Sequence, residues 1–416
     1  MRQLHKKTDI TLKNSFEQTQ FIDWRTQARS YKLYPNFFRR YNIDEYEELK
    51  FIKNFGKITT TKRYGKEEVN LRANPSAGGL YPCEIYIQIR GIKSFLSGIY
   101  HYEPLNNNLT LIHELSNDGL EFYFNTDSKK FIFLISNVYF RSSWKYDKRA
   151  NRYLLLDTGH QLASIFVALK NENINFDFEF DFDKKNLNKE FGFDTQEFFQ
   201  CAILVDKEKD TKPKQLRETL VSVAPTDYFI KNIFLEEFIK KIENEKIEEK
   251  IDASIFENVE IKNIQNSIDK RRSIRGFKKE SISKNEFEEL TKDIFEIAQK
   301  INIELYFINN NIKDMKQGVY KNVTLVEEGD FKATGTKLAF NQQLGGDSCF
   351  TLFFTANKNS NYLISYIFSA FLAHIINLRC ANLDIGCSGI GAYFDDESKK
   401  VLNTTNNILY LQAIGK

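Results

Sequence analysis

Cysteine is scarce in this chain and has no regular spacing. Five cysteines occur in 416 residues, and an odd number without framework spacing argues against a disulfide-stapled fold and predicts a reducing compartment. We therefore expect a cytoplasmic protein. Cys380 and Cys387 are the closest pair, but six residues separate them and no histidine lies between them, which argues against a zinc site. We predict no metal.

Segments that would direct the chain to a membrane are missing as well. Residues 1–7 are basic, but no apolar stretch follows them, so we expect no signal peptide. The longest apolar run, residues 362–378, is short and contains Ser365, Ser369 and His374. These interruptions argue against a membrane span and favour a buried helix where two domains meet.

No charge of one sign dominates the composition. The net charge of +3 at pH 7 predicts no general attraction to nucleic acid or to membranes. A hydrophobic content of 42% with 14% aromatic residues is typical of a folded globular protein. The length is sufficient for two domains that each bury a core.

The most informative segment is residues 71–82, which read Leu-Arg-Ala-Asn-Pro-Ser-Ala-Gly-Gly-Leu-Tyr-Pro. Its small residues, 76–79, would let backbone N–H groups approach a flat or anionic ligand. The alternation in residues 84–89 predicts a half-buried β-strand directly after the loop. A tight turn that closes a hairpin would account for the same residues. The segment therefore indicates a ligand-binding loop only in combination with motifs elsewhere in the chain.

Three further blocks accompany this segment. They are Lys145-Tyr146-Asp147-Lys148-Arg149 with Arg152-Tyr153 and Asp157-Thr158-Gly159-His160-Gln161, then Arg271-Arg272-Ser273-Ile274-Arg275-Gly276-Phe277, and finally Ser388-Gly389-Ile390-Gly391-Ala392-Tyr393-Phe394-Asp395-Asp396. Together the four blocks resemble those of the nitroreductase-like dehydrogenases that oxidise azolines in ribosomal peptides, of the microcin, streptolysin and cyanobactin type. One departure is Gln161 and the Leu-Ala-Ser after it, where the family has Ala-Gln-Asn. Another is order, because the Arg-Arg-Ser block follows the Pro-Ser-Ala-Gly loop here.

An internal repeat explains that order. Four segments of the first half recur in the second half: residues 96–100 as 316–320, 131–136 as 350–355, 152–169 as 362–378, and 201–205 as 409–415. We therefore predict an α+β fold of two tandem nitroreductase-like domains, each with a mostly antiparallel sheet flanked by helices, that form an intramolecular pseudo-dimer. The expected parts are an N-terminal extension (1–50), a first domain (51–207), a charged helical connector (208–262) and a second domain (263–416).

The two halves retain complementary motifs. The first half has the Pro-Ser-Ala-Gly loop and the Lys-Tyr pair, and the second half has the Arg-Arg-Ser and Gly-x-Gly blocks. Since the resemblance implies FMN held by two subunits, the division predicts one composite FMN site per chain, with further oligomerisation possible. A dinucleotide fingerprint is absent because Phe394 occupies the position of its third glycine.

The resemblance also assigns residues to roles. Lys145 and Tyr146 match its catalytic pair, although for a bare Lys-Tyr dipeptide the default explanation would be a surface lysine beside a core tyrosine. The arginines offer guanidinium groups suited to a phosphate, although a solvated helix start is an alternative explanation. The predicted FMN-binding residues are Arg271, Arg272, Ser273, Arg275, Pro75, Ser76, Ala77, Gly78, Gly389, Ile390 and Gly391.

The function implied by the resemblance is FMN-dependent oxidation of thiazoline or oxazoline rings in a modified precursor peptide, in association with a cyclodehydratase. Molecular oxygen is a plausible electron acceptor. One alternative is a nitroreductase-type reductase of small molecules that uses NAD(P)H, which would not need the Lys-Tyr pair. Another is a catalytically inactive scaffold that binds peptide within a maturation complex.

Overall fold

A computed structural model describes residues 1–15, 22–64 and 67–416 of the chain, and its contacts divide it into two compact units. Unit 1 comprises Met1–Phe21, Ala73–Pro75 and Ser254–Lys416, and unit 2 comprises Ile22–Arg72 and Ser76–Ala253. The predicted extension over residues 1–50 is thus shared between the units. Residues 16–21, in that extension, and 65–66, in the predicted first domain, lie outside the described residues.

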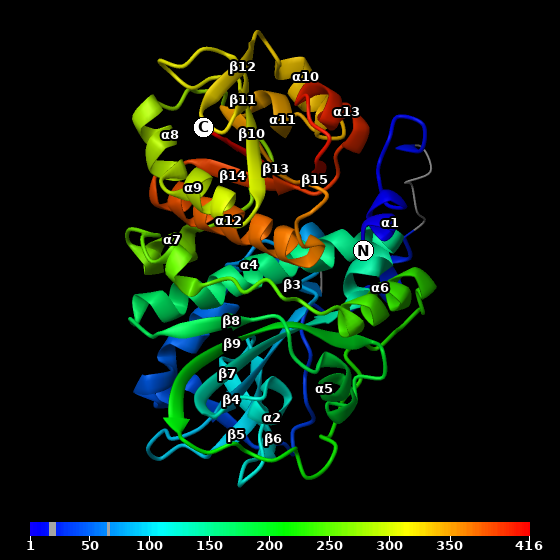
Figure 1. Ribbon diagram of the computed structural model, residues 1–416, viewed down its shortest axis with the longest axis vertical. Coiled ribbons are helices and arrows are strands. Elements are labelled where there is room, and N and C mark those ends of the chain that lie inside the picture. Colours follow the sequence, from blue (N-terminus) through cyan, green and yellow to red (C-terminus); the bar gives the residue numbers. More distant parts are fainter. Residues whose placement is uncertain (16–21, 65–66) are drawn as a thin grey trace. The chain divides into compact units, whose positions relative to one another are not determined.

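Unit 2 is built on a seven-stranded antiparallel sheet of order β1-β6-β5-β4-β7-β9-β8 (Figure 1). Its strands are β1 (Arg40–Asn42), β4 (Cys83–Ile89), β5 (Gly98–Glu103), β6 (Asn108–Glu114), β7 (Ser128–Val138), β8 (Phe176–Glu179) and β9 (Glu197–Lys209). A separate hairpin pairs β2 (Ile58–Tyr64) with β3 (Glu67–Arg72). The helices are α2 (Glu121–Phe124), α3 (Tyr139–Tyr146), α4 (Ala150–Asn171), α5 (Lys184–Glu190) and α6 (Ile233–Asn244).

Short turns of 3-10 helix complete unit 2. They are η2 (Trp24–Thr26), η3 (Ile43–Glu45), η4 (Glu47–Phe55), η5 (Ala77–Gly79) and η6 (Asp147–Arg149). The helical period that the sequence shows at residues 235–242 lies within α6, where Asn232 caps the first turn by accepting from the Leu235 N–H at 3.2 Å. Leu235, Phe238, Ile239 and Ile242 form its buried side, as the 3.6-residue period requires.

The strand after the Pro-Ser-Ala-Gly loop differs from the prediction. Residues 84–89 were expected to be half-buried, but β4 is buried at every position, because it lies inside the sheet between β5 and β7. Its polar residues have partners within unit 2: the carboxylate of Glu84 accepts from Arg141 at 2.6 Å and lies 2.8 Å from His101 Nε2, and Gln88 accepts from the Leu120 N–H at 2.7 Å. The polar residues that alternate along β4 therefore form a buried face with hydrogen-bond partners, and not a face exposed to solvent.

Unit 1 contains a six-stranded antiparallel sheet of order β12-β11-β10-β13-β15-β14 (Figure 1). Its strands are β10 (Ile303–Asn309), β11 (Gly318–Lys321), β12 (Thr324–Glu328), β13 (Phe350–Ala356), β14 (Gly386–Ile390) and β15 (Asn407–Gly415). Its helices are α1 (Arg2–Lys6), α7 (Ile264–Lys270), α8 (Lys284–Thr291), α9 (Ile294–Lys300), α10 (Lys332–Leu338), α11 (Leu344–Asp347), α12 (Tyr362–Asn382) and α13 (Asp395–Val401). The 3-10 turn η7 (Ala253–Phe256) begins at the last residue of unit 2.

The two sheets have the same topology, which confirms the predicted repeat. Six strands of unit 2, in the order β6-β5-β4-β7-β9-β8, correspond one to one with β12-β11-β10-β13-β15-β14 of unit 1. The four matched sequence pairs lie on β5 and β11, β7 and β13, α4 and α12, and β9 and β15. The predicted fold class, tandem α+β domains with antiparallel sheets, is therefore correct.

The start of the chain is part of unit 1. Ile10 and Asp395 exchange two hydrogen bonds of 2.9 Å, one from each backbone N–H. His5 Nδ1 lies 3.3 Å from the hydroxyl of Tyr362 and 3.2 Å from that of Tyr366. Residues more than 350 positions apart in the sequence are thus joined by buried hydrogen bonds within this unit.

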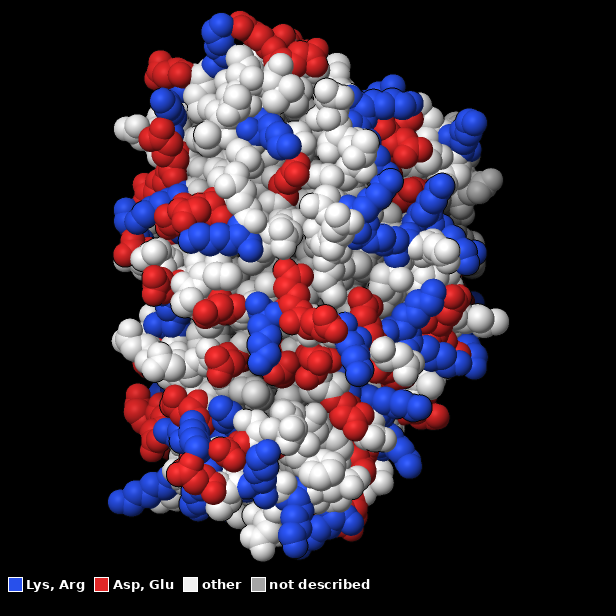
Figure 2. Space-filling model, in the orientation of Figure 1, with Lys and Arg blue, Asp and Glu red and all other residues white. Residues whose placement is uncertain are grey.

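Helix α12 is long and apolar enough to cross a membrane, and the structure buries its whole apolar window. Its serines bond within the helix, Ser365 to the Asn361 carbonyl and Ser369 to the Ser365 carbonyl, each at 2.7 Å. This agrees with the expectation of a buried helix. Lys and Arg occur together with Asp and Glu over the whole visible face in Figure 2, as the small net charge leads one to expect.

Candidate functional site

Residues 76–81 of the Pro-Ser-Ala-Gly loop belong to unit 2, and their backbone favours glycine at two positions. Gly78 and Gly79 have φ of 66° and 68°, and Tyr81 after them has φ of 45°, in the left-handed region that glycine tolerates best. The loop closes on itself because the Tyr81 N–H donates to the Ser76 hydroxyl at 2.9 Å. The Tyr81 hydroxyl in turn accepts from the Arg72 N–H at 2.8 Å. These bonds fix residues 76–81 as one preorganised turn.

Asp157 of α4 lies under this loop. Its Oδ2 is 3.5 Å from the Ala77 backbone nitrogen, and its Oδ1 is buried without a hydrogen-bond partner among the described residues. Burial raises the pKa of Asp157 to about 7, while hydrogen bonds from Ser76 and Ala77 and the charge of Arg72 act in the opposite direction. A carboxyl group with such a pKa can change its protonation state near neutral pH.

The catalytic candidates Lys145 and Tyr146 end helix α3, and Asp147, with φ of 42°, breaks the helix directly after them. Both side chains are half-buried. Tyr146 packs on Tyr153 with ring centroids 4.4 Å apart. Lys145 Nζ lies 5.7 Å from the centroid of the Tyr146 ring. The pair therefore presents a phenol and an amine at one end of a short helix.

Tyr146 also reaches the Pro-Ser-Ala-Gly loop. A Cβ placed on Gly78 would lie 2.8 Å from the Tyr146 hydroxyl, so only glycine lets the two groups lie this close without a shift. Unit 2 thus brings together residues that the sequence separates by about seventy positions: the loop at 76–78, the tyrosine of the pair, and Asp157.

Arg141 holds this arrangement in place. It is fully buried on α3, its Nη1 donates to the Tyr81 carbonyl at 3.0 Å, and the same group is 2.6 Å from Glu84 Oε1. Burial opposes ionisation of Glu84, but Arg141, His101 and Arg72 keep its pKa below the ordinary value. One guanidinium therefore connects the helix of the catalytic pair, the end of the loop and strand β4.

The Arg-Arg-Ser block of unit 1 follows α7 as an extended segment, where Ser273 bridges to Cys387 of β14 and the Ile274 N–H donates to the Cys387 carbonyl at 3.3 Å. Arg271 is buried and donates to the Ser273 hydroxyl at 3.3 Å, whereas Ser273 and Arg275 are exposed. Arg272 donates to two carbonyls at the end of α7, of Asp269 at 2.9 Å and of Arg271 at 2.7 Å, so it has a helix-ending role as well.

The Gly-x-Gly block has a structural use at its first glycine. Gly389 lies in β14 against Tyr410, whose hydroxyl would be 1.7 Å from a Cβ at that position. Ile390 is buried in the core cluster of unit 1, and Gly391 follows the strand in a half-exposed position. The need for glycine at position 389 is therefore explained by Tyr410 of the same unit. The backbone at Gly391, after the strand, is partly accessible.

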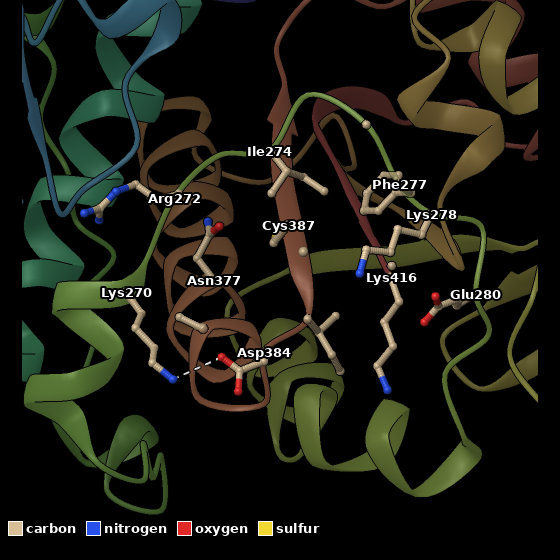
Figure 3. Close-up of a pocket in the computed structure, with 15 residues that line it drawn as sticks. Lys270, Arg272, Ile274, Phe277, Lys278, Glu280, Asn377, Asp384, Cys387 and Lys416 are labelled. Carbon is tan, nitrogen blue, oxygen red and sulfur yellow. Dashed lines mark hydrogen bonds and ion pairs between the residues drawn. The ribbon is translucent and has the colours of Figure 1, made fainter. Parts of the chain in front are cut away.

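A pocket of about 390 Å³ lies in unit 1 beside this block (Figure 3). It is lined by four cations and two carboxylates, together with apolar and small residues: Lys270, Arg272, Ile274, Gly276, Phe277, Lys278, Glu280, Asn377, Ala381, Asp384, Ile385, Gly386, Cys387, Gly415 and Lys416. Lys270 and Asp384 pair at 3.1 Å across its rim. Of the predicted FMN residues described in unit 1, Arg272 alone belongs to this lining, because neighbours along an extended segment point to opposite sides.

Sequence reasoning gave no role to Arg141, Asp157 or Trp24. Asp157 is part of the block that carries the resemblance, but its burial under the loop depends on a contact across eighty positions. Trp24 lies in a segment that resembles no motif identified in the sequence. The only feature of the sequence that could have singled it out is that the chain has just two tryptophans.

Comparison with known proteins agrees with the fold. Residues 268–416 match the Nitroreductase family. A "putative nitroreductase" of Methanocaldococcus jannaschii is 28% identical over 107 residues, which are 24% of this chain and 54% of that protein, so the chain spans about half the length of this curated relative. The crystal structure of a "putative nitroreductase" from Anabaena variabilis superposes with a TM-score of 0.81 at 20% identity, over 100% of this chain and 99% of that one.

A solved E. coli microcin synthetase complex with a bound truncated pro-peptide also matches, at 15% identity over 50% of this chain and 87% of that one, with a TM-score of 0.32. Similarity at that level supports no conclusion. What the comparisons establish is the nitroreductase fold over the full length and a Nitroreductase family domain at residues 268–416.

Proposed function

We propose that the protein is an FMN-dependent oxidoreductase that dehydrogenates thiazoline or oxazoline rings in a modified precursor peptide. The observation that carries the proposal is the position of Tyr146, whose hydroxyl lies against Gly78 of the Pro-Ser-Ala-Gly loop, with Lys145 beside it. A reductase of small nitro compounds would not need this pair, so its placement at the loop favours azoline oxidation over that alternative.

The residues present suit FMN. Arg271, Ser273 and Arg275 form a donor set of two guanidinium groups and a hydroxyl, which is the chemistry that a phosphate dianion prefers. Gly78 has no Cβ and a left-handed φ of 66°, so a ligand can approach its backbone closely, whereas the Gly79 N–H already donates to the Ser76 carbonyl at 3.0 Å. We assign the phosphate to Arg271, Ser273 and Arg275, and contacts with the flavin to the loop, from Pro75 to Gly78, and to the accessible backbone at Gly391. When bound, FMN would serve as the acceptor of a hydride, that is of two electrons and one proton, from the substrate ring.

The remaining chemistry belongs to the chain. Aromatisation of an azoline removes two electrons and two protons from the ring, and one of these protons must be taken by a base. We assign this role to the Lys145 amine, with the Tyr146 hydroxyl orienting the ring or sharing the proton. Asp157 and Arg141 hold the loop and α3 around the pair and have no contact with substrate in this scheme.

The proposal implies two further participants by their chemistry. A cyclodehydratase must form the azoline from a cysteine, serine or threonine of the precursor peptide, and an electron acceptor such as molecular oxygen must reoxidise the cofactor. The distribution of motifs over the two halves predicts about one FMN per chain.

The test begins with the visible absorption spectrum of the purified protein and the flavin released on denaturation. The protein reconstituted with FMN is then incubated with a synthetic thiazoline peptide, and loss of two hydrogen atoms is followed by mass spectrometry. We expect conversion by the wild type, loss of at least about 100-fold in rate for Lys145→Ala, and little change for Lys148→Ala, an exposed neighbour.

Each other outcome points elsewhere. Reduction of nitro compounds by NAD(P)H without azoline oxidation would support the small-molecule reductase. Failure to retain FMN after reconstitution would support a peptide-binding scaffold. An unchanged rate in Lys145→Ala would contradict the assignment of the base.

A further inference from the structure

Trp24 is an exposed aromatic residue with a fixed position in unit 2. It begins the turn η2, which Asp23 caps by accepting from the Arg25 N–H at 3.1 Å. Its side chain is 65% exposed. Isolated exposed aromatic residues are common, so exposure alone does not indicate a binding site. Trp24 differs from them because contacts with α3 fix its position.

The turn is anchored on α3 by the second tryptophan of the chain. Trp144 is buried, and its Nε1 donates to the Thr26 hydroxyl at 3.0 Å. The rings of Trp24 and Trp144 meet edge to face, with centroids 5.4 Å apart and planes at 73°. Trp144 Nε1 also donates to the Asp23 carbonyl at 3.4 Å, so these two hydrogen bonds and the aromatic contact fix the indole of Trp24 without covering it.

That indole stands beside the catalytic candidates. Lys145 Nζ lies 6.0 Å from the centroid of the Trp24 ring and 5.7 Å from that of the Tyr146 ring. Trp144 immediately precedes Lys145 in α3, so the anchor of the turn and the proposed base are neighbours on one helix. A ligand ring that reaches Lys145 would therefore meet a flat apolar face at the same place.

We propose that Trp24 is a specificity-determining residue that holds the ring of the peptide substrate beside Lys145. The inference rests on the proposed function and adds the element that selects a flat heterocycle. An azoline is nearly planar and apolar on its faces, and an indole gives a large, rigid contact surface at little cost in conformational entropy. The cysteine, serine or threonine from which the azoline is made has no flat ring to stack, so the same contact would discriminate against unmodified peptide.

Binding can be read directly, because Trp24 and Trp144 are the only tryptophans in the sequence. The FMN-loaded protein, with its flavin reduced beforehand and oxygen excluded so that no peptide is oxidised, is titrated with a short synthetic peptide that contains one thiazoline, and with the same peptide carrying the uncyclised cysteine, while indole fluorescence is recorded. We expect the thiazoline peptide to change the emission and to bind about tenfold more tightly than its cysteine counterpart.

Variants separate stacking from folding. Trp24→Ala is expected to weaken thiazoline-peptide binding, and to raise KM for its oxidation, about tenfold with little change in kcat. Trp24→Phe should restore most of the affinity. Phe37→Ala removes another exposed aromatic of unit 2, 82% exposed and stacked on Phe38, and should bind as the wild type does. Affinity of the variants is measured by calorimetry, since their fluorescence differs.

The outcomes distinguish this inference from the proposed function. Oxidation with an unchanged KM in Trp24→Ala would overturn the role of Trp24 and leave the function intact. Tight thiazoline-dependent binding that needs Trp24, without any oxidation, would support the role and contradict the function. Equal affinity for the thiazoline and cysteine peptides, or no binding of either, would overturn the inference.

Discussion

Replacing Asp157 by asparagine should stabilise unit 2 at alkaline pH and have little effect below about pH 4. The carboxyl is buried, its Oδ1 has no partner among the described residues, and its pKa is raised from 3.8 to about 7. Since the folded state binds this proton more tightly than the unfolded state, the stabilising contribution is complete below about pH 4 and is lost as the pH rises through 7.

The size of the effect follows from that pKa. One pKa unit corresponds to about 1.4 kcal/mol, so ionisation of Asp157 above pH 7 costs the folded state at most about 4 kcal/mol. Asparagine has nearly the same shape and cannot ionise. We expect Asp157→Asn to be more stable than the wild type by about 2 kcal/mol at pH 5, where the unfolded carboxyl is already ionised, and by about 4 kcal/mol at pH 8.5.

Urea unfolding followed by tryptophan fluorescence is the appropriate assay, because both tryptophans lie in unit 2. The FMN-free protein is used, so that cofactor binding does not shift the transition. Asp177→Asn serves as the control, since Asp177 is an exposed residue of β8 in the same unit. A stability difference that stays constant between pH 5 and 8.5 would refute the reasoning, because it would mean that Asp157 does not titrate in this range.

Three further outcomes can be measured with the same methods. Arg141→Met should destabilise unit 2 by about 3 kcal/mol, because it leaves Glu84 buried without its guanidinium partner; a loss below about 1 kcal/mol in urea unfolding would contradict this. Gly78→Ala should cost about 1–2 kcal/mol and lower the rate of azoline oxidation, since the residue has φ of 66° and faces the Tyr146 hydroxyl, whereas Gly276→Ala, which has open space around it, should be neutral. Arg275→Ala should weaken FMN binding about tenfold in fluorescence titrations, with a smaller loss at high salt; an unchanged affinity would exclude Arg275 from the phosphate site.

The repeat and the sheet topology could be read from the sequence because they depend on local patterns. Strands β7 and β13 both contain an apolar run, and helices α4 and α12, which are 22 and 21 residues long, follow them in the chain. Such pairs of elements keep their order along the chain when side chains diverge. The weak similarity between residues 131–136 and 350–355 was therefore sufficient to predict the repeat.

The details that the sequence did not yield depend on contacts between distant residues. The burial of β4 follows from its central place in the sheet, which its alternating letters do not encode. Asp157 and Ala77 meet across eighty positions, and no local pattern predicts a carboxyl without a full set of partners. For Gly389, sequence reasoning saw space for a ligand, and the structure shows a tyrosine of the neighbouring strand in that space.

The composition of unit 1 has a consequence for how the protein is made. Unit 2 is complete once residue 253 has been synthesised, but unit 1 needs both the first residues of the chain and the last ones. Because domains generally fold as units during synthesis, Ile10 must wait without its partner until Asp395 has left the ribosome. The described residues 1–15 therefore acquire their contacts in unit 1 only after residues that lie 385 positions further along the chain have been made.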